Sequence, residues 1–181
     1  FSIIMLLAGI GMMVWYHASQ KKEPIAEKLP QQDPLFSFKP TPSQLAVVKY
    51  FWVVAALFLV QMIMGIISAH YGVEGDGFYG IPIAKWLPYV ITRTWHTQLG
   101  IFWIATAWLA AGLYIGPAVA GKEPKFQRLG VNILFGALIV VVAGSMTGEW
   151  LGVMGKMTGD NWFYFGHQGY EYVDLGRIWQ I

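Results

Sequence analysis

Residues 45–69 read LAVVKYFWVVAALFLVQMIMGIISA. Apolar side chains occupy every face of a helix built from this stretch, and Lys49 is its only charged residue. About 20 such residues, at 1.5 Å per residue, are enough for an α-helix to cross the hydrocarbon core of a bilayer. The stretch therefore predicts a transmembrane helix.

The composition of the whole chain also favours a lipid environment. Hydrophobic residues make up 56% of it and charged residues 12%, whereas a soluble domain carries about 25% charged residues. The chain has no cysteine, which excludes disulfides, thiolate zinc sites, iron–sulfur clusters and covalently attached haem c. A net charge of +2 without a basic cluster gives no indication of a nucleic-acid partner.

Three further apolar stretches extend the pattern, at residues 1–17, 90–115 and 131–150. Together with residues 45–69 they predict an all-α fold, a polytopic bundle of transmembrane helices with four spans. The chain opens on Phe1, already inside an apolar run. We therefore interpret the sequence as a fragment of a larger bundle, with its first span truncated and the rest of the same polypeptide as a partner.

The segments between the spans are polar or rich in glycine. Residues 18–44 combine lysines with prolines and predict a linker, and residues 70–89 and 116–130 predict loops. Residues 151–181 are rich in glycine and aromatic residues, with a helix expected near 167–181.

The distribution of Lys and Arg predicts the orientation, because these residues are more frequent in cytoplasmic loops. Of the twelve in the chain, eight lie on the side of the linker and the 116–130 loop: Lys21, Lys22, Lys28, Lys39, Lys49, Lys122, Lys125 and Arg128. This side is expected to be cytoplasmic. Residues 70–89 and 151–181 then lie at the outer face, where most of the reactive side chains collect.

One histidine, His96, lies near the start of the third predicted span, in Arg93-Thr94-Trp95-His96-Thr97-Gln98. An imidazole at this depth is either hydrogen-bonded to a neighbouring helix or bound to a metal. Without cysteine, an axial haem ligand is the metal site to consider, with His70 as one source of a second ligand. On spacing alone, a packed interfacial histidine is the more common explanation.

A second group consists of His70, Glu74 and Phe78. If the second helix continues beyond Ala69, these positions at i, i+4 and i+8 share one face. An imidazole and a carboxylate can accept the two protons of a quinol while a ring packs on its plane. An ordinary polar loop is the more common explanation of the spacing alone, and the glycines at 72, 75 and 77 weaken the helical assumption.

Two acids, Glu171 and Asp174, lie at i, i+3 in the expected C-terminal helix and share a face. Such a pair can bind a hard cation or pass on protons, although a solvated face is more usual.

In the fourth predicted span and just after it, Gly144, Gly148 and Gly152 repeat every four residues, which favours close helix packing over a phosphate loop.

These motifs resemble those of nitric oxide reductases, members of the haem–copper oxidase superfamily. Residues 92–99, TRTWHTQL, are similar to the second core helix of the catalytic subunit, and residues 51–65 to the first. Residues 169–174, GYEYVD, resemble an outer-face segment with two acids. The resemblance covers residues 45–181.

The resemblance implies roles for individual residues. His96 matches an axial ligand of the low-spin haem b, and Glu171 an acid associated with a calcium ion. Asp174 matches the neighbouring acid, to which we assign proton transfer. It is Glu in the relatives fed by cytochrome c, and Tyr170 replaces a frequent Arg there.

Two features favour the quinol-fed branch of the family. The span at residues 1–17 fits an outer domain tethered ahead of the core, and His70, Glu74 and Phe78 match the quinol site in type and spacing. The resemblance thus implies an enzyme of the bacterial cytoplasmic membrane that oxidises quinol and reduces two NO to N2O and water. Its NO-reducing centre, a high-spin haem b beside a non-haem iron, is expected in the remainder of the polypeptide. A homodimer is left open.

Two other classes of protein remain as alternatives. A haem b-binding membrane anchor of another quinone oxidoreductase accounts for His70 and His96 but not for the acid pair. A transporter fragment accounts for ionisable residues in broken helices, but the sequence shows no inverted repeat and its charges collect at one face.

Overall fold

The computed structural model describes residues 2–20, 38–157, 159–166 and 176–179. The helices are α1 (Ser2–Ser19), α2 (Pro42–Glu74), α3 (Tyr89–Ala120), α4 (Gln127–Val153) and the short α5 (Asn161–Phe165). Two 3-10 turns, η2 (Ile83–Lys85) and η3 (Arg177–Trp179), complete the order. No strand occurs within the described ranges, so the all-α expectation is confirmed.

Three helices, α2, α3 and α4, are long and apolar enough to cross a membrane. The expected fourth span is not confirmed, because the apolar part described in α1 covers only Leu7–Tyr16. This helix belongs to a separate unit, Phe1–Lys39, whereas the other elements form the unit Pro40–Ile181. The membrane bundle considered below is therefore the second unit.

Each of these three helices extends beyond the apolar stretch that predicted it. α2 begins at Pro42 because Thr41 caps it: the Thr41 hydroxyl accepts from the backbone N–H of Gln44, and the Gln44 side chain accepts from that of Thr41. This reciprocal capping box satisfies two backbone donors that a helix start leaves unpaired. A polar capping motif thus starts α2 before the hydrophobic limit seen in the sequence.

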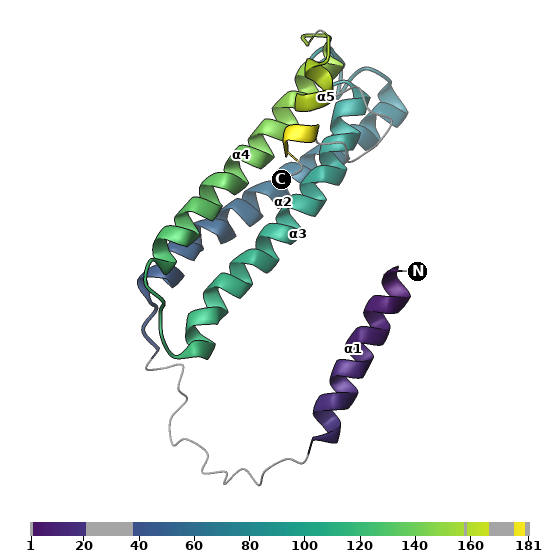
Figure 1. The fold of residues 1–181 in the computed structure, drawn as a ribbon. Coiled ribbons are helices and arrows are strands. Elements are labelled where there is room, and N and C mark those ends of the chain that lie inside the picture. Colours follow the sequence, from purple (N-terminus) through teal and green to yellow (C-terminus); the bar gives the residue numbers. More distant parts are fainter. Residues whose placement is uncertain (1, 21–37, 158, 167–175, 180–181) are drawn as a thin grey trace. The chain divides into compact units, whose positions relative to one another are not determined.

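α3 runs alongside α2, and α4 contacts both helices (Figure 1). At one end of the bundle, Val47 and Tyr50 of α2 pack with Ala110 of α3 and Val131 of α4. The Tyr50 hydroxyl donates to the Val131 carbonyl at 2.7 Å. At the other end, Met64 and Ile67 of α2 pack against Leu99 of α3.

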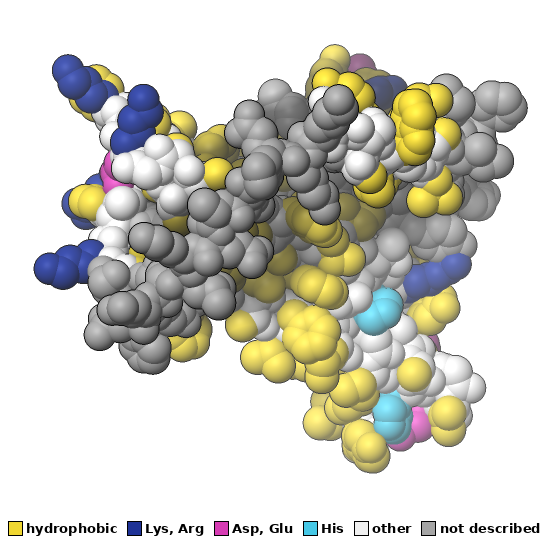
Figure 2. Space-filling view, turned by 90° about the horizontal axis from the view of Figure 1, so that it is seen from below, with side chains coloured by type: hydrophobic (Ala, Val, Ile, Leu, Met, Phe, Trp, Pro, Cys, Tyr) yellow, Lys and Arg dark blue, Asp and Glu magenta, His cyan; other side chains and the backbone are white. Residues whose placement is uncertain are grey.

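The outer surface of these helices remains apolar. Trp52 is 74% exposed and Trp108 77% exposed, and hydrophobic side chains cover much of the described surface in Figure 2. Soluble monomers rarely expose contiguous apolar areas of this extent. Together with the lengths of the helices, this surface fits a protein embedded in lipid.

The glycines of α4 allow the C-terminal segments to approach its backbone. A Cβ at Gly148 would overlap the carbonyl oxygen of Phe165, and one at Gly144 would overlap the indole of Trp179. The four-residue repeat of glycine therefore does serve close packing, of α5 and η3 against α4.

Replacing Gly148 by alanine is expected to displace the segment around Phe165, because the added methyl group has no space beside a backbone carbonyl. Overpacking of this kind costs about 1–3 kcal/mol, which should appear as a lower melting temperature and faster proteolysis after α4. Gly136→Ala, on the same helix with nothing within 4 Å of its Cβ position, is the matched control. Equal stability of the two variants would contradict the prediction.

A carboxylate joins the α3–α4 loop to the start of α2. Glu123 accepts from the backbone N–H of Ser43 at 3.4 Å. A hydrogen bond from the Thr41 side chain, more than the Ser43 contact, lowers the pKa of Glu123. A carboxyl with a lowered pKa stabilises the fold above its unfolded pKa, and this contribution is lost as the pH falls through the folded pKa.

We expect Glu123→Gln to lower the melting temperature slightly at neutral pH. The difference from the wild type should shrink as the pH falls below 4.5, the ordinary pKa of the group, and disappear below the lowered pKa of folded Glu123, where both side chains are neutral. Thermal unfolding in detergent at several pH values tests this. A difference that is the same at all pH values would show that the charge of Glu123 is not involved.

Candidate functional site

His96 lies on the side of α3 that faces α2. Its ring packs against Gly65, where a Cβ would stand 2.7 Å from the His96 Cε1 and 2.9 Å from its Nδ1. The missing side chain lets the imidazole reach the backbone of α2, and Nδ1 lies 2.8 Å from the carbonyl oxygen of Gln61.

The contact between His96 and Gln61 determines which ring nitrogen is available. A carbonyl oxygen can only accept a hydrogen bond, so the Nδ1 of His96 must carry the proton. In a neutral imidazole, Nε2 then has a free lone pair, and no hydrogen bond to it occurs among the described residues. Metal-bound histidines commonly have this arrangement, with the second nitrogen donating to a carbonyl group.

The side chain of Gln61 also bonds to α3, which holds the His96–Gln61 contact in place. Its amide oxygen accepts from the indole N–H of Trp103 at 2.8 Å, and its amide nitrogen lies over Gly100. Gln61 therefore connects two positions of α3, holding Trp103 by its side chain and His96 by its backbone. The carbonyl that orients His96 is fixed between two packed helices.

His70, Glu74 and Phe78 are brought together, but not on one continuous helix. α2 ends at Glu74, and Gly75 turns the chain with a φ of 72°. Phe78 follows this reversal of the chain and begins a tight turn to Ile81 in which Tyr79 and Gly80 have positive φ. The ring centroids of His70 and Phe78 are 4.7 Å apart.

A carboxylate and a second ring complete this group. His70 Nδ1 lies 3.1 Å from Glu74 Oε1, although the two are not aligned for a hydrogen bond. The backbone N–H of Gly80 donates to Glu74 Oε2 at 3.3 Å. Tyr79 stacks obliquely on His70 with centroids 4.3 Å apart. The His70 and Glu74 side chains are 21% and 30% exposed, so solvent can exchange protons with them.

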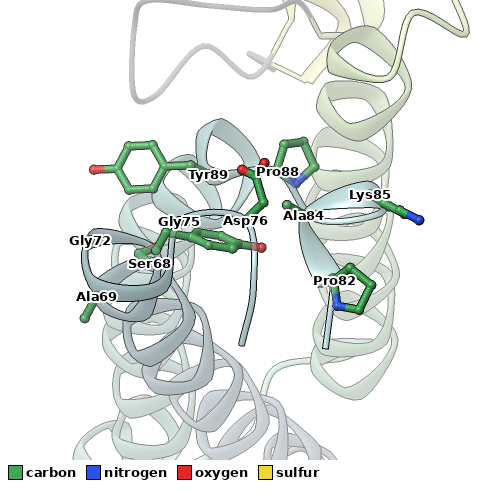
Figure 3. A pocket seen from close by; sticks show the side chains of 11 residues that line it. Ser68, Ala69, Gly72, Gly75, Asp76, Pro82, Ala84, Lys85, Pro88 and Tyr89 are labelled. Atoms are coloured by element: carbon green, nitrogen blue, oxygen red, sulfur yellow. The ribbon is translucent and has the colours of Figure 1, made fainter. Parts of the chain in front are cut away.

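A cavity of about 960 Å³ lies beside this group, on another face of the α2 end. Figure 3 shows Ser68, Gly72 and Gly75 on one side of it and Pro82, Ala84 and Pro88 on the other. Asp76 also lines the cavity, but His70, Glu74 and Phe78 do not. The cavity and the His70 group are therefore two separate places for a ligand at this end of the bundle.

His70 and His96 are turned toward different surroundings. Gly65, beside His96, is five residues before His70 on α2, which corresponds to about 140° around the helix. His70 instead packs with Phe78 and Tyr79. This arrangement does not favour His70 as a partner ligand of His96.

The expected calcium site is outside the described residues, since Glu171 and Asp174 both fall in 167–175. Most of the helix expected near 167–181 is outside them too. Within the described ranges, no group of three or more His, Asp or Glu side chains could hold a metal ion. The Glu171 and Asp174 assignments stay predictions.

Four residues near these sites had no role assigned from the sequence. Gln61 and Gly65 lay within the stretch that resembled the family, but only their contact with His96 shows what they do. Tyr79 is placed by a turn that periodicity does not reveal. Glu149 is 3% exposed inside the bundle. Its position in an apolar span was a signal that could have identified it.

The chain was compared with known proteins. The family model described as cytochrome C and quinol oxidase polypeptide I matches residues 45–181, about three quarters of the sequence. A comparison with curated proteins finds no match. The matched region contains α3, α4, all but the first three residues of α2, and both histidine sites. The chain therefore belongs to the cytochrome c and quinol oxidase polypeptide I family and is a multi-pass membrane subunit of the haem–copper oxidase type.

Proposed function

We propose that the chain is the quinol-oxidising, electron-transfer part of a quinol-dependent nitric oxide reductase. The observation that carries the proposal is the His96 contact, in which Nδ1 donates to Gln61 and leaves Nε2 available. This donor set fits a haem b axial ligand, and a bound haem would supply one-electron transfer. The second axial ligand is not assigned to any residue of this sequence.

The quinol site is proposed at His70, Glu74 and Phe78, with Tyr79 added. Oxidation of a quinol to a quinone releases two electrons and two protons. An imidazole and a carboxylate 3.1 Å apart can each accept one of these protons. Phe78 and Tyr79 pack on His70, and they provide the aromatic edge against which a quinol ring can rest.

The distance that an electron would travel from this site to a haem at His96 is short. His70 lies in the last turns of α2, and His96 contacts α2 five residues earlier, at Gly65. Five residues correspond to about 7.5 Å along a helix. Both groups lie at the end of the bundle that the Lys and Arg distribution assigns to the outer face.

The remaining parts of the proposal rest on the sequence resemblance. They are the calcium ion at Glu171, proton transfer through Asp174, and a high-spin haem b with non-haem iron elsewhere in the polypeptide. Elemental analysis tests the first, because Glu171→Ala should lower the calcium content of the purified protein. Unchanged calcium would leave Glu171 and Asp174 as a solvated face.

The absorption spectrum of the purified full-length protein, oxidised and reduced, tests the proposed class. A reductase should show both low-spin and high-spin haem. A haem-binding anchor of another quinone oxidoreductase should show low-spin haem alone, and a transporter should be colourless. The anchor is the second candidate, because the His96 geometry suits it equally well.

A further inference from the structure

A group of cations lies at the end of the bundle where α3 passes into α4. Lys122 and Lys125 are in the loop, Arg128 is in the first turn of α4, and all three are exposed. Lys49 of α2 belongs to the same end, because its ammonium group donates to the side chain of Asn132 on α4 at 2.5 Å. That partner is neutral, so it does not compensate the charge of Lys49. The group therefore draws positive charge from α2, α4 and the loop between α3 and α4.

The acid in this loop, Glu123, is held at the start of α2. Its carboxylate accepts from the backbone N–H of Ser43 at 3.4 Å, and the loop and the start of α2 meet at this end of the bundle (Figure 1). Arg128 is the cation that acts on this carboxylate. Within the described part of the chain, no ion pair joins either loop lysine to an acid. The loop therefore presents an excess of positive charge.

An aromatic ring follows Lys125 in the same loop. The Phe126 side chain is 79% exposed, and its backbone has a φ of 65°. This left-handed conformation is unfavourable for residues other than glycine, asparagine and aspartate. The exposed ring does not contribute to the core of the bundle, so it fits an apolar environment beside the cations. The boundary between headgroups and acyl chains provides such an environment.

The loop stays close to the bilayer surface. α3 ends at Ala120 and α4 begins at Gln127, so the connection comprises residues 121–126 alone. Apolar side chains are exposed on both sides of it, Val119 on α3 and Leu129 on α4. Long basic side chains near the ends of transmembrane helices reach the headgroup region. The loop lysines are therefore at the level where lipid phosphates lie.

We propose that the loop between α3 and α4 binds anionic phospholipid, with the headgroup phosphate at Lys122 and Lys125 and the Phe126 ring in the adjoining part of the bilayer. Phosphate oxygens accept hydrogen bonds from ammonium groups and carry the complementary charge. Basic clusters next to a transmembrane helix attract anionic lipid for this reason. A soluble acidic partner would match the charge but not the exposed ring. The surface lies toward the opposite end of the bundle from His70 and His96, and it depends on neither haem nor quinol.

A photoreactive group in place of Phe126 tests the proposal at the site itself. The full-length protein carrying benzoylphenylalanine at position 126 is placed in vesicles of equal phosphatidylglycerol and phosphatidylcholine and irradiated, and the crosslinked lipids are identified by mass spectrometry. Phosphatidylglycerol should be crosslinked in excess. Equal crosslinking of the two lipids would overturn the proposal, and so would crosslinks to protein in place of lipid.

Two pairs of lysine substitutions provide the comparison. Lys122→Gln with Lys125→Gln should bring the lipid ratio toward one, by roughly 5-fold for each lysine, the usual contribution of a basic residue near a membrane surface. Lys85→Gln with Lys156→Gln removes two exposed lysines near the other end and should leave the ratio unchanged. An unchanged ratio in the first pair, or an equal fall in both, would overturn the proposal.

Inorganic phosphate distinguishes a lipid headgroup from free phosphate as the ligand. Sodium phosphate and sodium chloride at the same ionic strength screen charges equally, so both should lower the lipid ratio to the same degree. A larger fall with phosphate would assign the loop lysines to free phosphate and overturn the proposal.

Discussion

We expect His96→Ala to abolish the low-spin haem b absorption of the purified holoprotein. The methyl group that remains cannot coordinate iron, and no other described side chain offers a nitrogen at this position of α3. If His96 holds a haem, the variant would lack the imidazole that keeps its iron low-spin. The measurement is the reduced-minus-oxidised spectrum, together with the haem content per polypeptide. A retained low-spin band would exclude His96 as the ligand.

Gly65→Ala tests the geometry behind that assignment while His96 itself stays unchanged. The new Cβ would lie 2.7 Å from the His96 Cε1, so the ring must move away from the Gln61 carbonyl. We expect a shifted or weakened haem band in this variant. Gly112→Ala on α3, with nothing within 4 Å of its Cβ position, is the control for inserting a methyl group into the bundle. Identical spectra for Gly65→Ala and the wild type would show that the Gln61 contact does not orient the ligand.

The helical bundle could be predicted because hydrophobicity decides it. A stretch such as residues 45–69 has no alternative to a helix once lipid is the solvent, since every backbone group must be paired within the segment. The exact ends were less predictable. They depend on side chains such as Thr41 and Gln44, which cap α2 and carry no hydrophobic signal.

The sequence could nominate residues for the candidate sites but not describe their geometry. The spacing of His70 and Glu74 gave their contact correctly, because both lie on α2. Phe78 reaches them because the chain reverses after α2, from Gly75 with its φ of 72°, instead of continuing as a helix, and periodicity cannot describe such a reversal. The contact of His96 with Gln61 depends on how two helices pack, and a single sequence does not contain that information.

The last expectation concerns quinol oxidation. His70→Ala and Glu74→Ala should each slow quinol-driven turnover by about 100-fold, the usual contribution of one positioned acid or base. Their effect on turnover with an artificial reductant that feeds electrons directly to haem should be small. The reason is chemical: only quinol releases protons at this site, so only quinol needs the imidazole and the carboxylate.

The two electron donors, used in parallel on the same preparations, separate the possible outcomes. Equal loss with both donors would mean that His70 and Glu74 maintain structure or haem, and the haem spectrum of His70→Ala would reveal the latter. Asp76→Asn changes a carboxylate that lines the neighbouring cavity instead. If Asp76→Asn slows quinol oxidation while His70→Ala and Glu74→Ala do not, quinol binds in the cavity. Selective loss in the His70 and Glu74 variants, with Asp76→Asn near the wild type, would place proton release at His70 and Glu74, whose Nδ1 and Oε1 atoms lie 3.1 Å apart.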